Sequence, residues 1–211
     1  MKNVVLLHIP HSSLELTKEF KNIEKHITKS KVKEFNYTIT DLYADKLFSF
    51  GRFKGIKAKY SRICCDMERF ADDTKEYMSK YGMGVVYTKT HKNEQLISFS
   101  KSYKDRILKK YYYPYHSKLT LMTNSYLAKN KYVILVDCHT FSAEIIMDNK
   151  TQNLPDICIG CNNWTQKDDK LLSFTKNYFT QLGYKTTINH PYSRAIIPNG
   201  LLRVKRKIFI Q

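Results

Sequence analysis

The stretch KYVILVDCHTFS, from Lys131 to Ser142, decides how this sequence folds. Tyr132–Val136 is a run of the residues that fill a buried strand. Asp137, Cys138 and His139 follow it directly, with no turn residue between. Burying such groups without partners is costly, about 2–7 kcal/mol even for a neutral polar group. Either these three are satisfied structural residues, or the strand delivers ligands to a site.

Length and composition predict a globular protein with a substantial core. The chain has 211 residues, of which 42% are hydrophobic and 13% aromatic, which excludes a disordered chain. We find no repeat and no linker, and expect one domain over residues 1–211. The 36 basic and 19 acidic residues give a net charge of +17. Such a charge attracts anions, but it is spread along the chain and is also typical of a solvated surface.

The cysteines and the N-terminal residues bear on the compartment. The start, MKNVVLLHIPHSS, has a short apolar run without a small-residue cleavage site, and we interpret it as a strand. No window approaches the roughly 18 apolar residues of a membrane span. We therefore expect a cytoplasmic protein with free thiols and no membrane partner. Cys158 and Cys161 form a CxxC, but DICIGC resembles a strand more than a metal site, and no second pair follows at zinc-ribbon spacing.

Strand and helix signals alternate along the chain, which predicts an α/β fold with much of the sheet buried on both faces. The predicted strands are Val4–Ile9, Ile56–Cys65, Met83–Tyr87, Tyr132–Val136, Asp156–Gly160, Tyr184–Asn189 and Lys207–Ile210. The predicted helices are Leu16–Lys33, Asp41–Phe48 with Thr40 as a possible N-cap, two helices within Phe99–Asn130 divided by Pro114, and Asp168–Leu182 closed by Gly183.

Candidate ligands follow the predicted strands. In an open α/β sheet, sites lie beyond the carboxyl ends of the strands. Two imidazoles and a carboxylate from such ends can form a three-ligand zinc site with an open position for water. For His8 we favour a structural role, whereas for His11 and His139 the metal-binding and structural interpretations both stay open. The candidates are His8 and His11 in LLHIPHSS, Asp137 and His139 in DCHTFS, and Arg62, Asp66, Glu68 and Arg69 in YSRICCDMERF.

Eight segments, in this order between residues 8 and 198, resemble the N-formylglutamate amidohydrolase family: HIPHSS, TDLYADKLF, YSRICCDMERFADD, YGMGVVYTKT, YYYPYH, DCHTFS, PDICIG and NHPYSRAIIP. The resemblance implies a mixed central sheet flanked by helices, in the phosphorylase/hydrolase-like fold of the zinc carboxypeptidases. It also implies a Zn²⁺-dependent amidohydrolase that acts on a small anionic N-acyl amino acid, such as N-formylglutamate, or on a peptide-like amide.

The same resemblance implies roles for individual residues. His11 and His139 match the two zinc histidines. Arg69 matches the arginine that grips the substrate carboxylate, which suits the bidentate geometry of a guanidinium better than that of an ammonium group. Arg62, Glu68 and Tyr192 are expected to contribute to substrate binding. Zinc lowers the pKa of a bound water to roughly 7, so that hydroxide is available at neutral pH.

Two positions depart from the family pattern. The first concerns the third metal ligand, because Leu14 stands where a Glu is expected three residues after the first histidine. Asp41, in TDLYADKLF, is our first choice for the missing carboxylate, and Glu68 is the second. A structural role for Asp41 at a helix start remains an equal alternative.

The second departure is at the C-terminus. The chain ends KIFIQ, which places Gln211 where the family has the Glu that acts as general base and acid. A glutamine cannot take a proton from a zinc-bound water. If another residue is the base, His116 in YYYPYH and Glu68 are the next candidates.

Three functions follow from these observations: a zinc amidohydrolase, a catalytically impaired relative that still binds zinc and an anionic ligand, and a basic nucleic-acid-binding domain. No RNA- or DNA-binding motif accompanies the positive charge, which makes nucleic acid the least favoured partner. Metal content separates the first two functions from the third, and hydrolysis of small N-formyl amides separates the first from the second.

Overall fold

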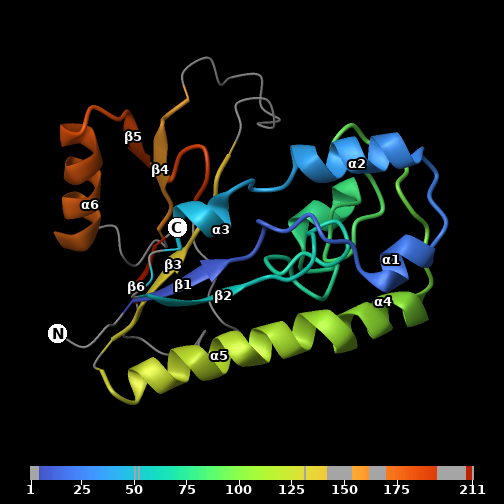
Figure 1. The fold of residues 1–211 in the computed structure, drawn as a ribbon, viewed down its shortest axis with the longest axis horizontal. Coiled ribbons are helices and arrows are strands. Elements are labelled where there is room, and N and C mark those ends of the chain that lie inside the picture. Colours follow the sequence, from blue (N-terminus) through green and yellow to red (C-terminus); the bar gives the residue numbers. More distant parts are fainter. Residues whose placement is uncertain are drawn as a thin grey trace.

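A four-stranded parallel sheet organises the fold (Figure 1). The structure is a computed structural model that describes residues 5–49, 51, 53–130, 132–141, 154–161 and 170–193, and the backbone of 208–210. The strands follow the order β2 (Lys54–Lys57), β1 (Val5–Ile9), β3 (Ile134–Asp137) and β6 (Ile208–Ile210). Two more strands, β4 (Ile157–Ile159) and β5 (Thr186–Ile188), form a separate parallel pair.

The expected α/β class is confirmed, but the sheet differs from the one that the family resemblance implied. Every strand pair among the described residues is parallel, whereas the resemblance implied a mixed sheet. Parallel strands require long crossover connections. That requirement agrees with the long segments that separate β1 from β2 and β2 from β3.

Strand β1 lies inside the sheet and is buried on both faces. Leu6 packs with Ile56, Leu135 and Leu119, the last of which belongs to helix α5 (Tyr113–Leu127). On the opposite face, Leu7 and Ile9 pack with Ala44 of the short helix α3 (Ala44–Leu47) and with Cys138. Side chains alternate across a strand, so His8 shares the α5 face with Leu6.

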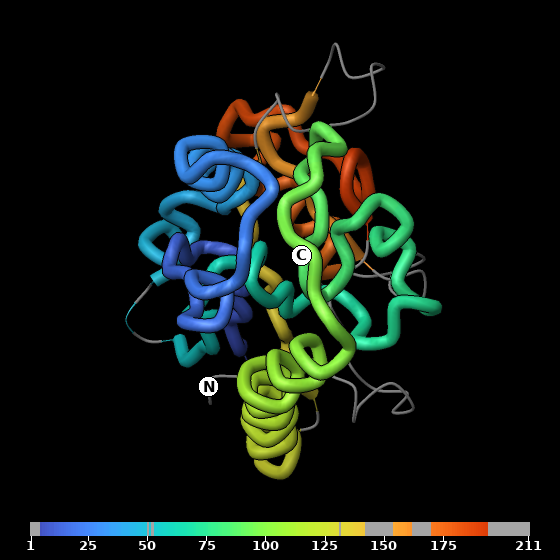
Figure 2. Tube along the Cα trace, turned by 90° about the vertical axis from the view of Figure 1, so that its right-hand side faces the viewer, coloured from blue at the N-terminus to red at the C-terminus, as the bar shows by residue number. Residues whose placement is uncertain are grey.

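Helices α4 (Lys101–Ile107) and α5 form one long rod beneath the sheet in Figure 1, which Figure 2 shows nearly end-on. We predicted a break at Pro114, and the helix continues instead. A π-helical turn at Leu108–Tyr112 joins the two helices, and the N–H of Tyr113 bonds to the carbonyl of Leu108 five residues back. This wider turn accommodates a proline, which cannot donate a backbone hydrogen bond.

The segment predicted as one helix, Leu16–Lys33, forms two helices, α1 (Lys18–Asn22) and α2 (Lys29–Thr38). Thr17 and Thr28 cap them, each accepting a hydrogen bond from a backbone N–H of the first turn. The prediction that Thr40 is the N-cap of this helix was wrong, because Thr40 does not cap α3. Its hydroxyl donates to the carbonyl of Asn36, and Tyr43 precedes α3 in the left-handed conformation, with a φ of 64°.

Two predicted strands are mostly irregular. The predicted strand Ile56–Cys65 leaves the sheet after Lys57, because the chain turns at Ser61, whose carbonyl accepts from the N–H of Cys64. Met83–Tyr87 forms a single antiparallel bridge between its ends. Apart from Ile56 in β2, the buried apolar residues of both segments instead fill the largest core together with α1, α2 and α4. A short 3₁₀ helix, η1 (Tyr77–Tyr81), lies between the two segments.

The last described helix, α6 (Lys170–Gln181), packs against β4 and β5 beside the main sheet (Figure 1). Gly183 ends it with a φ of 89°, a left-handed conformation that favours glycine. Within the described residues, no helix is long and apolar enough to cross a membrane. All five cysteines are free, as expected.

Gly55 tests the close contact between β1 and β2. A Cβ atom at this position would lie 2.8 Å from the carbonyl oxygen of Leu7 and 2.9 Å from its Cβ. We expect Gly55→Ala to lower the free energy of unfolding by about 1–3 kcal/mol, because the two backbones must separate. Gly51→Ala is the matched control, since a Cβ there meets nothing within 4 Å. Urea denaturation measures both variants, and equal stabilities would contradict this account of the strand contact.

Candidate active site

The site lies where β1 and β3 end side by side. The strands are parallel neighbours, and His8 is the register partner of Asp137. His11 and His139 lie three and two residues further along their chains, beyond the carboxyl ends of the strands. Parallel pairing therefore brings two segments about 130 residues apart in sequence to the same edge of the sheet.

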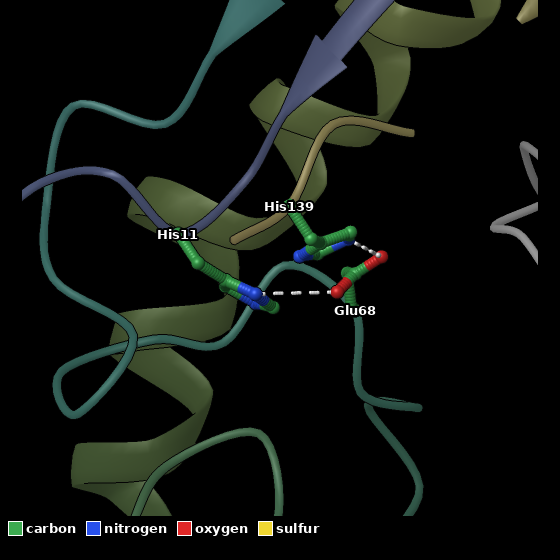
Figure 3. A group of neighbouring side chains, drawn as sticks. All are labelled: His11, Glu68 and His139. Carbon is green, nitrogen blue, oxygen red and sulfur yellow. Dashed lines mark hydrogen bonds and ion pairs between the residues drawn. The ribbon is translucent and has the colours of Figure 1, made fainter. Parts of the chain in front are cut away.

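Glu68 lies between the two histidines (Figure 3). Its Oε2 is 3.3 Å from Nδ1 of His11, and its Oε1 is 3.2 Å from Nε2 of His139. The histidine ring centroids are 5.1 Å apart. One ligand atom from each of the three residues lies within 4.8 Å of the others. Two imidazoles and one carboxylate at this spacing are a typical donor set for a catalytic zinc ion.

A buried carboxylate holds the other ring nitrogen of each histidine. Nε2 of His11 is 2.8 Å from Oδ1 of Asp66, and Nδ1 of His139 is 2.8 Å from Oδ2 of Asp41. If these nitrogens carry the protons, the lone pairs of the remaining nitrogens point toward Glu68. Metal-binding histidines in proteins are oriented in this way by carboxylates.

Asp66 connects the histidine to an arginine and a tyrosine. Its side chain is fully buried, and its Oδ2 accepts from Nε and Nη2 of Arg62 and from the hydroxyl of Tyr87. Burial alone would raise the pKa of Asp66, but the charges of Arg62, His11 and Arg69 outweigh it and hold the pKa well below its usual value. Asp66 is therefore an anion at neutral pH. The sequence motif contained this residue, but the contact with Tyr87 had no sequence signal.

The centre attracts positive charge. Burial lowers the pKa of His139, but Glu68, Asp137 and Asp41 outweigh it and raise the pKa well above its usual value. Burial likewise raises the pKa of Asp41, but the hydrogen bond from His139 and nearby positive charges lower it overall. A cation bound here must displace the proton from His139. A low pH is therefore expected to weaken metal binding.

His8 and Asp137 form a deeper pair. Nδ1 of His8 is 2.5 Å from Oδ1 of Asp137, and both side chains are fully buried. The same Oδ1 is 3.3 Å from Nε2 of His139. The ring of Tyr115, on α5, lies 5.7 Å from that of His8. We expected a structural role for His8, and the structure places it directly beside the candidate ligands.

The two arginines differ in how many hydrogen bonds they make. Arg62 is engaged by Asp66 through Nε and Nη2. Arg69 donates from Nε to the carbonyl of Met83, while its Nη atoms have no hydrogen-bond partner among the described residues. The side chain of Arg69 is 19% exposed. Its guanidinium can therefore still form the bidentate pair with a carboxylate for which it was proposed.

Among the described residues, the remaining candidates form no hydrogen bond or ion pair with the side chain of His11, Glu68 or His139. Tyr192 packs against Phe141 with ring centroids 5.6 Å apart and is 40% exposed, and burial together with the charge of Asp41 raises its pKa. His116 lies on α5 against the ring of Tyr112, and burial lowers its pKa to about 4. In the described structure it makes no hydrogen bond or ion pair with His11, Glu68 or His139. Gln211 lies outside the described residues.

Comparisons with known proteins agree with this fold. The model of the N-formylglutamate amidohydrolase family matches residues 4–210, and the chain belongs to that family. A similar solved structure is the N-formylglutamate amidohydrolase from Ralstonia eutropha JMP134, with 18% identity, a TM-score of 0.79 and coverage of 99% of this chain and 81% of that one. A gene product from Agrobacterium tumefaciens also matches, with 18% identity, a TM-score of 0.66 and coverage of 99% and 80%. The comparison with curated proteins gave no match.

Asp66 offers a test of the buried charge network. We expect Asp66→Asn to lower the free energy of unfolding by about 3–5 kcal/mol at pH 7, because Arg62 and His11 lose a buried partner. The folded protein holds the pKa of Asp66 below its usual 3.8. The contribution of the carboxylate is therefore complete above that pH and is lost as the pH falls further.

Urea denaturation at several pH values measures this effect. Asp72→Asn is the control, because Asp72 is exposed and contacts only nearby residues. The prediction fails if Asp66→Asn and the parent unfold at the same urea concentration at pH 7.

Proposed function

We propose that this chain is a metal-dependent amidohydrolase that binds Zn²⁺ through His11, Glu68 and His139 and cleaves the amide bond of a small anionic N-acyl amino acid. The matched residues, on this proposal, form one catalytic domain. Family membership supports an amidohydrolase and a small amide substrate. The metal, its ligands and the identity of the substrate are inferences from the geometry of the site.

One observation carries the proposal: each histidine has one nitrogen on a buried carboxylate and the other beside Glu68. A purely structural histidine would need no second carboxylate. Among the described residues, the four carboxylates Asp41, Asp66, Glu68 and Asp137 lie around two arginines, Arg62 and Arg69, so an excess of two negative charges is left once a metal ion takes the place of the proton on His139. A divalent cation neutralises that excess.

The geometry favours Glu68 over Asp41 as the third ligand. Oδ2 of Asp41 lies on Nδ1 of His139, on the side of the ring away from Glu68, and also accepts from the N–H of Thr140. Asp41 is thus placed to fix the orientation of His139, as Asp66 is for His11. We therefore propose Glu68 as the third ligand in place of Asp41, which was our first choice from the sequence.

His11, Glu68 and His139 would hold a zinc ion that, when bound, would supply Lewis acidity to the amide carbonyl and a water molecule with a pKa lowered toward 7. The protein contributes binding and orientation. Arg69 pairs with the substrate carboxylate, and Arg62 holds Asp66 so that His11 keeps its orientation. Tyr192 and Phe141 form an aromatic wall that can exclude water from the bound amide.

The effect of Gln211 on the rate of catalysis stays a prediction. A positioned acid–base group typically accelerates proton transfer about 10²–10⁴-fold, and a glutamine lacks that capacity. We therefore propose that the chain binds metal and ligand but turns over slowly unless another group supplies the proton. The low pKa of His116, and the lack of a hydrogen bond or ion pair between it and the candidate ligands in the described structure, make it a weak candidate.

Metal analysis tests the proposal. We expect the purified protein to retain zinc at no less than one ion per chain after dialysis, and His11→Ala and His139→Ala to lose a large part of it, because each removes a direct ligand. His26→Ala is the control, since His26 is exposed and its side chain, among the described residues, hydrogen-bonds Ser98 and no candidate ligand. Zinc content that is the same in all three variants and the parent would refute the ligand assignment.

Arg69 tests the substrate class. Arg69→Lys keeps the charge but loses the bidentate geometry, and we expect it to weaken binding of L-glutamate, the amino-acid product, by about 1.5 kcal/mol or roughly tenfold. Calorimetric titration of the zinc-loaded protein measures the dissociation constant. Arg106→Lys, on the exposed face of α4, is the control. Unchanged affinity in Arg69→Lys would mean that another residue binds the carboxylate.

A further inference from the structure

Two buried side chains hold the peptide unit that follows Arg69. The hydroxyl of Tyr112 donates to the carbonyl of Arg69 at 2.8 Å, and the N–H of Phe70 donates to Oε2 of Glu76, also at 2.8 Å. Side chains thus engage both polar groups of this peptide bond, which lies outside the helices and strands. We propose that Glu76 and Tyr112 are positioning residues that fix Arg69 in the pose that receives the substrate carboxylate. This inference rests on the proposed role of Arg69 in substrate binding.

Glu76 also attracts the guanidinium of Arg69 itself. Its Oε1 lies 3.9 Å from Nε of Arg69, while Oδ2 of Asp66 lies 3.8 Å from the same nitrogen. That oxygen of Asp66 already accepts two hydrogen bonds from Arg62. The attraction to Glu76 balances the attraction to Asp66, so Arg69 is not drawn fully onto the carboxylate that Arg62 occupies. The Nη atoms of Arg69 therefore stay available to a ligand.

Glu76 is itself held in a fixed orientation. Its side chain is buried, and its Oε1 accepts from the N–H of Met78 at 2.9 Å, in the first turn of η1. Its other oxygen accepts from Phe70. Hydrogen bonds from backbone N–H groups to a carboxylate are among the stronger ones in proteins. The two oxygens of Glu76 thus join the bend that carries Arg69 to the start of η1.

The π-helical turn between α4 and α5 supplies the second support. Tyr112 is the last residue of that turn, and its side chain is buried. Single π-helical turns within α-helices occur frequently at functional sites, and this one places a hydroxyl on the carbonyl of Arg69. The ring of His116 packs against that of Tyr112 with centroids 4.2 Å apart. This contact restrains the ring of Tyr112 and gives His116 a packing role in place of a catalytic one.

Binding of L-glutamate to the zinc-loaded protein tests the inference. Tyr112→Phe removes one hydroxyl and keeps the buried ring, whereas Glu76→Gln removes one charge and keeps the shape of the side chain. We expect each variant to raise the dissociation constant, measured by calorimetric titration, about three- to tenfold, because Arg69 loses one of its supports. Tyr111→Phe is the matched control and should bind like the parent, since the hydroxyl of Tyr111 donates to Glu19 instead.

A double-mutant cycle separates positioning of Arg69 from a general structural role. If Tyr112 acts through Arg69, adding Tyr112→Phe to Arg69→Lys should raise the dissociation constant less than twofold further. The same loss in that background as in the parent overturns the inference, and so does parent-like binding by Tyr112→Phe and Glu76→Gln while Arg69→Lys binds weakly. Parent-like binding by Arg69→Lys instead refutes the carboxylate assignment on which the inference rests. The cycle with Tyr112→Phe decides the question even if Glu76→Gln does not fold.

Discussion

The parallel pairing of β1 with β3 is the constraint on which the candidate site depends. It sets His8 opposite Asp137, so that β1 and β3 end side by side at the same edge of the sheet. His11 and His139 follow directly after these two strand ends. A shift of one residue in this register would turn His8 and Asp137 to opposite faces. Leu6 and Leu7, which are buried on opposite faces of β1, oppose such a shift, because it would move them out of their two cores. The hydrophobic packing of the strand thus fixes the geometry of its polar end.

Charge is distributed unevenly in this protein. The chain as a whole is strongly basic, with a net charge of +17, yet three of its buried acids, Asp41, Asp66 and Asp137, lie beside His139, His11 and His8. Asp66 is the most constrained of them, since it contacts Arg62, Tyr87 and His11 at once. The positive surface can raise the local concentration of an anionic substrate. The buried acidic cluster, in contrast, is suited to binding a cation. The surface charge thus favours an anionic substrate and the buried charge favours a metal ion.

Much of the fold could be predicted from the sequence, because a short apolar run such as Tyr132–Val136 usually forms a buried strand. The predictions failed where an apolar run lies in a loop. Cys64 and Val85 are buried as strand residues would be, but they lie in a turn and a bend, and burial alone does not distinguish the two cases. Pro114 was misleading for a different reason, since a π-helical turn leaves room for it and has no clear sequence signature.

The candidate site shows the same limit. His11 and His139 could be found because each follows an apolar strand. The choice between Asp41 and Glu68 could not be made, because both carboxylates contact His139 and only their positions on the ring differ. The pairing of His8 with Asp137 was also beyond the sequence, since strand order and register decide it. The residue types thus indicated a metal-binding site. The contacts in the structure are needed to separate candidate ligands such as Glu68 from carboxylates that orient a ligand, such as Asp41.

The continuous helical rod of α4 and α5 packs against two hydrophobic cores, that of the N-terminal helices and that beneath the sheet. Tyr103, Ile107 and Leu108 pack into the core of the N-terminal helices, whereas Leu119 packs beneath the sheet, and Tyr115 touches both cores. A rigid element shared by two cores makes it difficult for one to open while the other stays closed. The turns that carry Glu68 and the strands that carry the histidines should therefore melt as one cooperative unit, which keeps residues from distant parts of the chain in register with one another.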